Sequence, residues 1–236
     1  MSLLEWPRRI AAIAQFHVDD PNQPTLSATD EHHLRTVLRA RSGEELVVTD
    51  GAGSWSLCEV GDVALHRVTP VHIDPPAPAT TLYLAPLKGD RSEWTVVKAT
   101  ELGVGRIVPL MSARVVVKFR GDVRDKIVAR WRRVANEANG QSRRSYDVII
   151  DEPLHVRDVP VNVALTHFDG GGDWNGVHGV CVGPEGGWDE GEWGEHPRLS
   201  LGPTVLRAET AGVVAASLLA FGAGGWGFTL VGEKSR

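Results

Sequence analysis

The chain has 236 residues, a formal net charge of −5 and a hydrophobic content of 42%, which suits one large folded domain or two of ordinary size. No apolar run is long enough to span a bilayer, the N-terminus lacks the layout of a signal peptide, and the two cysteines, Cys58 and Cys181, lie far apart. These features argue against a membrane-spanning, disulfide-stapled or zinc-finger protein and predict a protein of the reducing cytoplasm.

The first residues carry no clear pattern, and we predict an irregular extension up to about Gln15. A short helix is expected over 29–39, with Thr29 or Asp30 as its N-terminal cap. Its apolar residues, which would share one face, are Leu34, Val37 and Leu38.

Three short strands separated by turn residues follow this helix. They are expected over 45–49, 54–60 and 63–71. The pattern predicts a small barrel-like β domain over 1–74. The proline-rich segment 75–78 would join it stiffly to the rest of the chain.

Strands and helices alternate in the remainder of the chain. Apolar strands are expected over 82–85, 106–110, 161–165, 177–182 and 199–201, and helices over 92–102, 122–139 and 208–221. Alternation of this kind with fully apolar strands predicts an α/β domain over 79–236. Its sheet would be parallel and covered by helices on both faces.

Positive charge is concentrated between residues 88 and 145. This stretch has fourteen Lys and Arg against six Asp and Glu, a net charge of +8 in a chain whose total is −5. Such asymmetry is expected of a protein that attracts phosphate on one face. A pair of solvated, salt-bridged helices would have the same composition, and charge alone does not separate the two interpretations.

Two Gly-Pro loops follow neighbouring predicted strands. Gly-Pro-Glu-Gly-Gly occupies 183–187, and Leu-Gly-Pro occupies 201–203. Ligands of parallel sheets bind beyond the carboxyl ends of the strands, and glycine lets the backbone come close to them. The first loop lacks the spacing of a P-loop or a dinucleotide fingerprint. One such loop is more often an ordinary turn, but the pair predicts a flat ligand such as adenine, with Leu206 against its ring.

These segments resemble the C-terminal signature of the SPOUT-class methyltransferases, specifically the bacterial 16S ribosomal RNA uracil-N3 methyltransferases. The matching residues are Val-Gly-Pro-Glu-Gly-Gly at 182–187 and Leu-Gly-Pro-Thr-Val-Leu-Arg-Ala-Glu-Thr at 201–210. Further similar segments are 88–93, 98–104, 112–118 and 141–144, and a weaker similarity covers His33, 37–39, Gly43 and 50–51. Many relatives have Glu where Gly140 stands in this chain.

The resemblance implies an N-terminal PUA-like β-barrel that binds RNA and a C-terminal α/β domain with a deep trefoil knot, which is a rare exception to ordinary chain topology. It implies S-adenosylmethionine (SAM) as cofactor and a homodimer with the cofactor near the interface. The substrate would be N3 of a uridine in 16S ribosomal RNA of the small ribosomal subunit. The cofactor-binding residues it implies are Leu165, Thr166, His167, Gly183, Pro184, Glu185, Gly186, Gly187, Leu201, Gly202, Leu206 and Thr210. No metal is expected, because no ligand cluster is evident.

Methylation of uracil N3 requires loss of its proton or stabilisation of the uracil anion. An arginine near O2 or O4 would stabilise the anion. Arg207 is the first candidate, and Arg144 the second, with Gln141 orienting the base. Glu185 and Glu209 are the possible proton acceptors. Either arginine could instead make a structural or phosphate contact.

The basic residues predicted to bind RNA are Arg39, Lys88, Arg91, Arg114, Lys118, Arg133 and Arg143. Two other functions stay open. One is a different SPOUT reaction on ribosomal or transfer RNA, such as ribose 2′-O-methylation. The other is a non-catalytic RNA-binding or ribosome-assembly factor that kept the fold. The intact glycine loops favour an enzyme.

Overall fold

The computed structural model describes residues 5–76, 79–116, 121–192 and 194–223. Within these ranges no helix is long and apolar enough to cross a membrane. The same ranges contain no group of three or more His, Cys, Asp or Glu side chains arranged to hold a metal ion.

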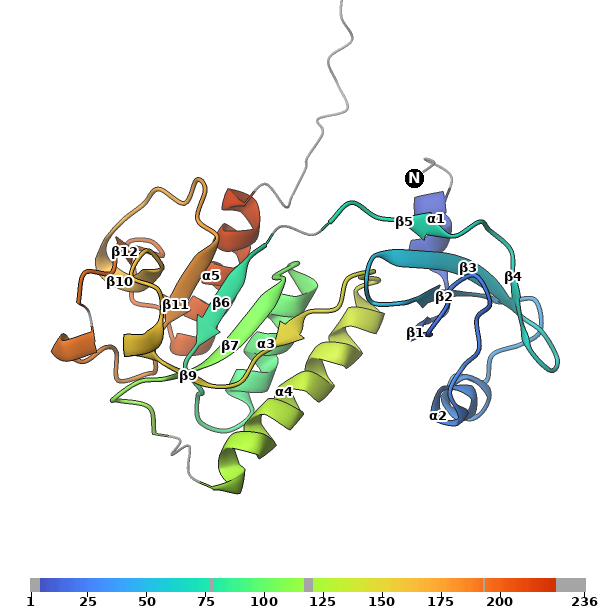
Figure 1. Cartoon of the computed structure of the whole chain (residues 1–236), viewed down its shortest axis with the longest axis horizontal. Helices are drawn as coiled ribbons and strands as arrows, with labels where there is room; N and C mark the ends of the chain where they lie inside the picture. The colour runs from blue at the N-terminus through green and yellow to red at the C-terminus, as the bar shows by residue number, and fades with distance from the viewer. Residues whose placement is uncertain (1–4, 77–78, 117–120, 193, 224–236) are drawn as a thin grey trace, which may run out of the picture. The chain divides into compact units, whose positions relative to one another are not determined.

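The chain divides into two compact units (Figure 1). The N-terminal unit contains residues 1–77 together with 133–148, and the C-terminal unit contains 78–132 and 149–236. The sequence pattern suggested a single boundary at the proline-rich linker. The structure adds 133–148 to the N-terminal unit, because side chains such as Arg143 bond to the backbone of residue Ala12.

The N-terminal unit is built on a five-stranded sheet, in agreement with the predicted small β domain. Its elements are α1 (Glu5–Ala11), β1 (Gln15–His17), α2 (Ala28–His32), β2 (Glu45–Thr49), β3 (Ser54–Val60), β4 (Leu65–Arg67) and β5 (His72–Ile73). The strand order is β1-β2-β3-β4, with β5 paired to β3. Alternating apolar residues of β1, β2 and β3 enclose a core that Leu34 completes.

The prediction of an irregular N-terminal extension is wrong, because α1 is anchored by a buried charge. Arg9 is 1% exposed, and its guanidinium lies 4.3 Å from the centre of the Trp55 ring. It donates hydrogen bonds to the carboxylate of Asp74 (2.7 Å) and to the backbone oxygen of Arg143 (2.6 Å). Arg8 and Arg9 are adjacent in a weakly patterned segment, and the sequence gives no signal that Arg9 has such partners.

The predicted helix over 29–39 is shorter and begins earlier. Ser27 caps α2, because its hydroxyl accepts a hydrogen bond from the backbone of Asp30. Residues His33–Val37 then form a wider, π-helical turn. The wider turn changes the angular spacing of side chains, so Leu34 is fully buried while Val37 is 61% exposed. The third predicted strand also contracts, to Leu65–Arg67.

The C-terminal unit contains the predicted parallel sheet. Its elements are β6 (Thr81–Leu84), α3 (Arg91–Glu101), β7 (Arg106–Met111), α4 (Asp122–Gln141), β8 (Ile149–Ile150), β9 (Leu154–His155), β10 (Ala164–Gly171), β11 (Gly179–Val182), β12 (Arg198–Leu199) and α5 (Ala208–Gly222), of which α4 runs on into the N-terminal unit. The strand order is β12-β10-β11-β6-β7-β8, and all of these pairs are parallel. The loops after β10 and β11 therefore emerge side by side at one edge of the sheet.

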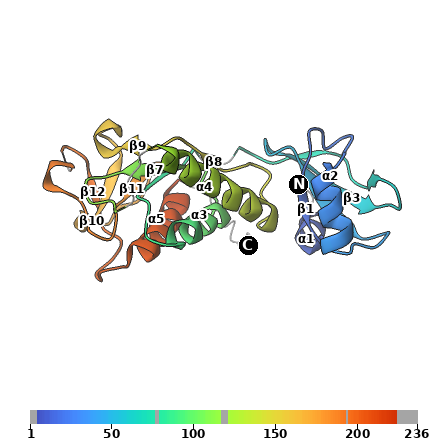
Figure 2. The same ribbon diagram turned by 90° about the horizontal axis from the view of Figure 1, so that it is seen from below.

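Helices α3 and α5 pack side by side, and α5 also contacts β11 and β6 (Figures 1 and 2). Their close approach depends on a glycine. A Cβ on Gly212 of α5 would lie 2.5 Å from Cγ2 of Thr95 in α3. This contact fixes the start of α5 relative to the start of α3.

Strand β10 differs from the prediction of a strand over 161–165. It begins at Ala164 and continues through the glycine-rich segment to Gly171. The reason is a close backbone approach: a Cβ on Gly170 would lie 2.6 Å from the backbone nitrogen of Leu199 in β12. The longer strand carries residues 167–171 past the end of β11, because Leu165 pairs with Cys181 and β11 ends at the next residue, Val182.

Candidate functional site

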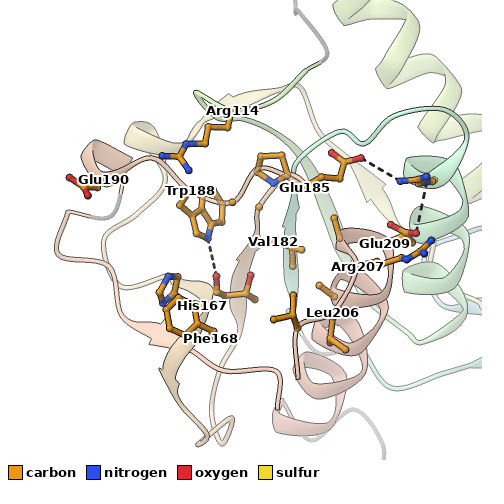
Figure 3. Close-up of a pocket in the computed structure, with 18 residues that line it drawn as sticks. Arg114, His167, Phe168, Val182, Glu185, Trp188, Glu190, Leu206, Arg207 and Glu209 are labelled. Atoms are coloured by element: carbon orange, nitrogen blue, oxygen red, sulfur yellow. Dashed lines mark hydrogen bonds and ion pairs between the residues drawn. The ribbon is translucent and has the colours of Figure 1, made fainter. Parts of the chain in front are cut away.

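A cavity of about 920 Å³ lies at the carboxyl end of β11 and beside the middle of β10 in the C-terminal unit (Figure 3). Parts of three stretches line it: 166–168 in β10, 182–188 after β11, and 205–211 at the start of α5. Arg91 at the start of α3 and Arg114 after β7 complete the wall. The structure thus brings the two segments with the Gly-Pro loops to one cavity.

The loop 183–187 has a shape that glycine makes possible. A Cβ on Gly183 would lie 3.0 Å from Cε2 of Trp188, so a larger residue would push the indole ring. Gly187 has φ +69°, and its backbone nitrogen donates to the oxygen of Pro184 (2.9 Å). A guanidinium nitrogen of Arg114, which also lines the cavity, donates to the backbone oxygen of Gly186 (3.1 Å).

Trp188 links two of the cavity's walls. It is 6% exposed, and its indole nitrogen donates to the backbone oxygen of Thr166 (2.9 Å), as Figure 3 shows. Sequence reasoning missed this residue as part of the site. A tryptophan directly after a glycine loop was the available signal, since a buried indole N–H needs an acceptor.

The second Gly-Pro loop leads into α5. Gly202 has φ +125°, which favours glycine. Arg207 is the N-cap residue of α5, with φ −64° and ψ 151°, and the exposed side chain borders the cavity together with Leu206. The helix that follows is largely apolar and buries Ala215 and Leu219 against the sheet.

Two carboxylates and one guanidinium meet at the side of the cavity next to α3. Arg91 lies 3.8 Å from Oε1 of Glu185 and 3.9 Å from Oε1 of Glu209. The backbone nitrogen of Lys88 also donates to Oε1 of Glu185 (3.3 Å). The two proposed proton acceptors therefore share one positive partner, and Figure 3 marks both contacts.

His167 and its neighbour Phe168 lie on the opposite wall. The Nδ1 atom of His167 is hydrogen-bonded to the carboxylate of Asp169, which also pairs with Arg198 at 3.3 Å. The hydrogen bond from His167 lowers the pKa of Asp169, and the charge of Arg198 adds to this. An ionised Asp169 fixes the orientation of the imidazole at the cavity wall.

The cavity collects most, though not all, of the residues predicted to bind a cofactor. Those that line it are Thr166, His167, Gly183, Pro184, Glu185, Gly187 and Leu206. Those outside its lining are Leu165, Gly186, Leu201, Gly202 and Thr210. Leu165 is 1% exposed and packs in the core beside Trp188. Gly186 belongs to the same loop as its lining neighbours.

Two of the three predicted catalytic residues, Arg144 and Gln141, belong to the N-terminal unit and do not line the cavity. Arg144 donates from Nε to the backbone oxygen of Tyr146 (3.2 Å). Burial lowers the pKa of Arg144 to about 10, with partial compensation by Asp147. Gln141 is exposed at the last residue of α4. Their catalytic role stays a prediction.

The residues predicted to bind RNA fall into different settings. Arg91 and Arg114 line the cavity, whereas Arg39, Lys88 and Arg133 are exposed elsewhere. Arg143 donates to the backbone oxygens of Gly140 (2.8 Å) and Ala12 (2.6 Å), so the N-terminal unit uses its guanidinium. Lys118 lies outside the described residues.

Ion pairs neutralise much of the basic segment 88–145. Besides the pairs that Arg91 and Arg114 make at the cavity, the pairs in the described part of the C-terminal unit include Arg130–Glu93, Arg124–Glu152, Arg132–Glu152, Lys98–Glu101, Arg106–Asp151 and Lys126–Asp122. The salt-bridged interpretation of the charge pattern therefore applies to these residues. Exposed pairs of this kind stabilise a protein weakly and exchange readily for other anions.

Comparison with protein families places both units in one class. The profile of a family described as an RNA methyltransferase domain matches residues 75–220, and that of an RNA methyltransferase PUA domain matches 27–69. A curated relative from Mycobacterium bovis, ribosomal RNA small subunit methyltransferase E, is 32% identical over 85% of this chain and 88% of its own length. The protein of the same name from Bacillus subtilis is 28% identical over 84% of this chain and 90% of its own.

Solved structures with the same arrangement include two with a bound cofactor. A methyltransferase from Legionella pneumophila in complex with SAM aligns with a TM-score of 0.75 and 26% identity, over 89% of this chain and 97% of that one. Ribosomal RNA small subunit methyltransferase E from Neisseria gonorrhoeae, bound to S-adenosyl methionine, aligns with a TM-score of 0.74 and 25% identity, over 88% and 97%.

Proposed function

This chain belongs to the RNA methyltransferase family, and on that premise we propose that it transfers the methyl group of SAM to N3 of a uridine in 16S ribosomal RNA of the small ribosomal subunit. The observation that carries the proposal is one cavity lined by the Gly-Pro loop after β11, by residues 166–168 of β10 and by residues 205–211, which follow the second Gly-Pro loop. The names of the relatives support the RNA substrate, and the two SAM-bound neighbours support the cofactor.

The cavity fits SAM in shape and charge. Its volume of about 920 Å³ lies within the range of about 300–1,000 Å³ common for ligand sites. Val182 and Leu206 offer apolar contact for an adenine, and Gly183 keeps the space above Trp188 free of side chain. Glu185, which lies on the cavity wall, would attract the cationic end of the cofactor.

When bound, SAM supplies an electrophilic methyl group on a positively charged sulfur. The protein's part is to orient the acceptor base and to stabilise the charge that develops on it. Arg207 borders the cavity and would stabilise negative charge on O2 or O4 of the uracil. Glu185 and Glu209 are the carboxylates on the cavity wall that could accept the N3 proton, and both are partly compensated by Arg91.

A homodimer with the cofactor near its interface, and the trefoil knot of the C-terminal domain, complete the proposal. Two large apolar side chains on the cavity wall support an interface, since Phe168 is 81% and Val205 is 96% exposed. Light scattering coupled to size-exclusion chromatography would measure the mass. A monomeric wild type that still methylates RNA would contradict the dimer. Action on ribosomal subunits also carries the expectation of a cytoplasmic protein.

The decisive experiment is a methyl-transfer assay with SAM, using small ribosomal subunits and, in parallel, naked 16S ribosomal RNA. Mass spectrometry of the nucleosides identifies the product. We expect 3-methyluridine. The appearance of 2′-O-methyluridine without 3-methyluridine would favour the ribose reaction and reject the base reaction.

The non-catalytic alternative is separated by calorimetric titration with SAM alone. A ribosome-assembly factor that kept only the fold has no need to bind the cofactor. We expect saturable binding with one SAM per chain. Absence of binding together with retained affinity for ribosomal RNA would favour the assembly factor.

A further inference from the structure

Arg91 lies on the cavity wall between Glu185 and Glu209. It is the first residue of α3, and its side chain is 46% exposed. One of its terminal nitrogens lies 3.8 Å from Glu185, which is on the loop after β11, and its Nε lies 3.9 Å from Glu209, which is in the first turn of α5 (Figure 3). One guanidinium therefore faces two segments that only folding brings together.

The backbone before Arg91 is held in place independently of that side chain. The hydroxyl of Ser92 accepts a hydrogen bond from the backbone nitrogen of Leu87 (2.7 Å), which closes a turn across the start of α3. Within this turn Gly89 has φ +69°, and the nitrogen of Lys88 donates to Glu185 (3.3 Å). The turn thus presents Arg91 to the loop that carries Glu185.

The other end of the bridge is fixed by helix packing. The hydroxyl of Thr95 donates to the backbone oxygen of Arg91 (2.9 Å), one turn earlier in α3. A Cβ on Gly212 would lie 2.5 Å from Cγ2 of the same Thr95, so α3 and α5 touch at this point. The start of α3 and the start of α5 are therefore at a set separation, which the Arg91 side chain spans.

The carboxylates of Glu185 and Glu209 depend on Arg91 for compensation of their negative charge. The side chain of Glu209 is only 17% exposed, and its Oε2 is buried without a hydrogen-bond partner in the part of the chain that the structure describes. Without Arg91, Glu209 and Glu185 would face the same cavity as two uncompensated negative charges. Repulsion between like charges would then move the loop away from the helix start.

We propose that Arg91 is a positioning residue for the cofactor site and not a phosphate ligand for RNA. Its guanidinium joins the loop 183–187 to the first turn of α5, and so sets the width of the cavity in which SAM binds. This inference rests on the proposed function, because SAM is the ligand whose affinity reports it.

The test compares SAM binding by the wild type, Arg91→Ala and Arg91→Lys in calorimetric titrations. Arg106→Ala is the matched control, because Arg106 is 44% exposed and pairs with Asp151 away from the cavity lining. We expect the Kd for SAM to rise about fivefold in Arg91→Ala, the upper range for a partly exposed ion pair. Arg91→Lys should recover part of the loss, and Arg106→Ala should bind as the wild type does.

A double-mutant cycle separates positioning from a general loss of stability. If Arg91 acts through Glu185, then Glu185→Gln should weaken SAM binding less in the Arg91→Ala background than in the wild type. Additive losses would overturn the bridge. The shift of the melting temperature by SAM, measured for each variant, reports the bound state independently of the stability of the free protein.

If Arg91 instead binds RNA phosphate, the variants should show the opposite pattern of affinities. Arg91→Ala would then bind SAM with unchanged Kd, while its affinity for ribosomal RNA would fall and the slope of log K against log salt would shrink by about one charge. That result overturns the inference and leaves the proposed function standing. A wild type that fails to bind SAM overturns both, and the two failures are told apart by the wild-type titration alone.

Discussion

The indole nitrogen of Trp188 donates a hydrogen bond of 2.9 Å to the backbone oxygen of Thr166. The two residues are 22 positions apart and belong to different cavity walls, one after β11 and one in β10. Through this bond the buried ring supports the loop 183–187 from below, and Gly183 packs on the ring face. The shape of the cavity therefore depends on a largely buried residue that lines it and also joins two of its walls.

Replacement of Trp188 by phenylalanine keeps an aromatic ring and removes the donor. The oxygen of Thr166 would lose its partner, which costs about 1 kcal/mol of the free energy of unfolding. Trp188→Ala would also leave a void and cost about 3–5 kcal/mol. Urea unfolding measures both values, and SAM titration should show weaker binding in the same order. Equal stability of the two variants would contradict a packing role for the ring.

Replacement of Gly183 by alanine tests the contact from the other side. The added Cβ would lie 3.0 Å from Trp188 and must displace the ring or the loop. We expect SAM affinity to fall by more than about tenfold, because the cavity wall itself moves. Gly172→Ala is the control, since a Cβ there meets nothing within 4 Å. Comparable losses in both variants would point to a general effect of glycine replacement.

Arg207→Ala separates cofactor binding from chemistry. The side chain is exposed at the cavity and its backbone already caps α5, so the substitution leaves the loop and helix intact. We expect an unchanged Kd for SAM and a fall in methyl transfer of about 10²–10³, the usual cost of losing one stabilising donor. Single-turnover assays on ribosomal subunits measure the rate, with Arg157→Ala as control, because the Arg157 side chain is 80% exposed and lies outside the cavity lining. Unchanged turnover would remove Arg207 from catalysis.

Much of the C-terminal unit follows from patterns visible in the sequence. Apolar strands and caps located β6, β7, β11, α3 and α5 within a residue or two. The wrong predictions of secondary structure share one cause, which is contact with residues far away in the sequence. Strand β10 extends through Gly170 only because β12 lies against it, and α1 exists because the charge of Arg9 is matched by Asp74. Secondary-structure propensity depends on the local sequence and does not predict such distant partners.

The location of the cavity was predictable from the sequence, whereas the ion pairs on its wall were not. Glycine spacing located the loop 183–187 on its wall and the loop 201–203 just before the lining residues of α5, since parallel strands end at one edge of a sheet. The sharing of Arg91 by Glu185 and Glu209 was not predictable, because the packing of α3 on α5 brings these three residues together. The charge pattern predicts that Arg91 contacts RNA, and only the packing of α3 on α5 supports the alternative that we propose, a positioning role at the cofactor site.

The two cysteines provide a chemical test of both cores. Burial raises the pKa of Cys58 to about 11, although a hydrogen bond with Ser56 opposes the shift, and burial also raises the pKa of Cys181. Only the thiolate reacts with iodoacetamide. At pH 8 we expect neither to be labelled in the native protein and both to be labelled in urea, as mass spectrometry would measure. Rapid native labelling of Cys181 would mean that β11 opens.

Asp74 gives the N-terminal unit a defined dependence on pH. Burial alone would raise the pKa of Asp74, but hydrogen bonds from Arg9 and Ser145 outweigh it, and the pKa lies below its usual value. A lowered pKa stabilises the folded state fully above the unfolded value of about 4, and this stabilisation disappears as the pH falls through the lowered one. Acid should therefore weaken the tie between Arg9 and the segment that carries Ser145.

At pH 7 we expect Asp74→Asn to lower the free energy of unfolding by about 3 kcal/mol, because the guanidinium of Arg9 stays buried without a counter-charge. The difference from the wild type should shrink below about pH 4, where the wild-type carboxylate is itself protonated. Urea unfolding at pH 7 and pH 3 measures both values. Asp122→Asn is the control, since that carboxylate is 72% exposed and pairs with Lys126 on the surface. A difference that stays constant with pH would mean that Asp74 acts through hydrogen bonds that its amide preserves, and not through charge.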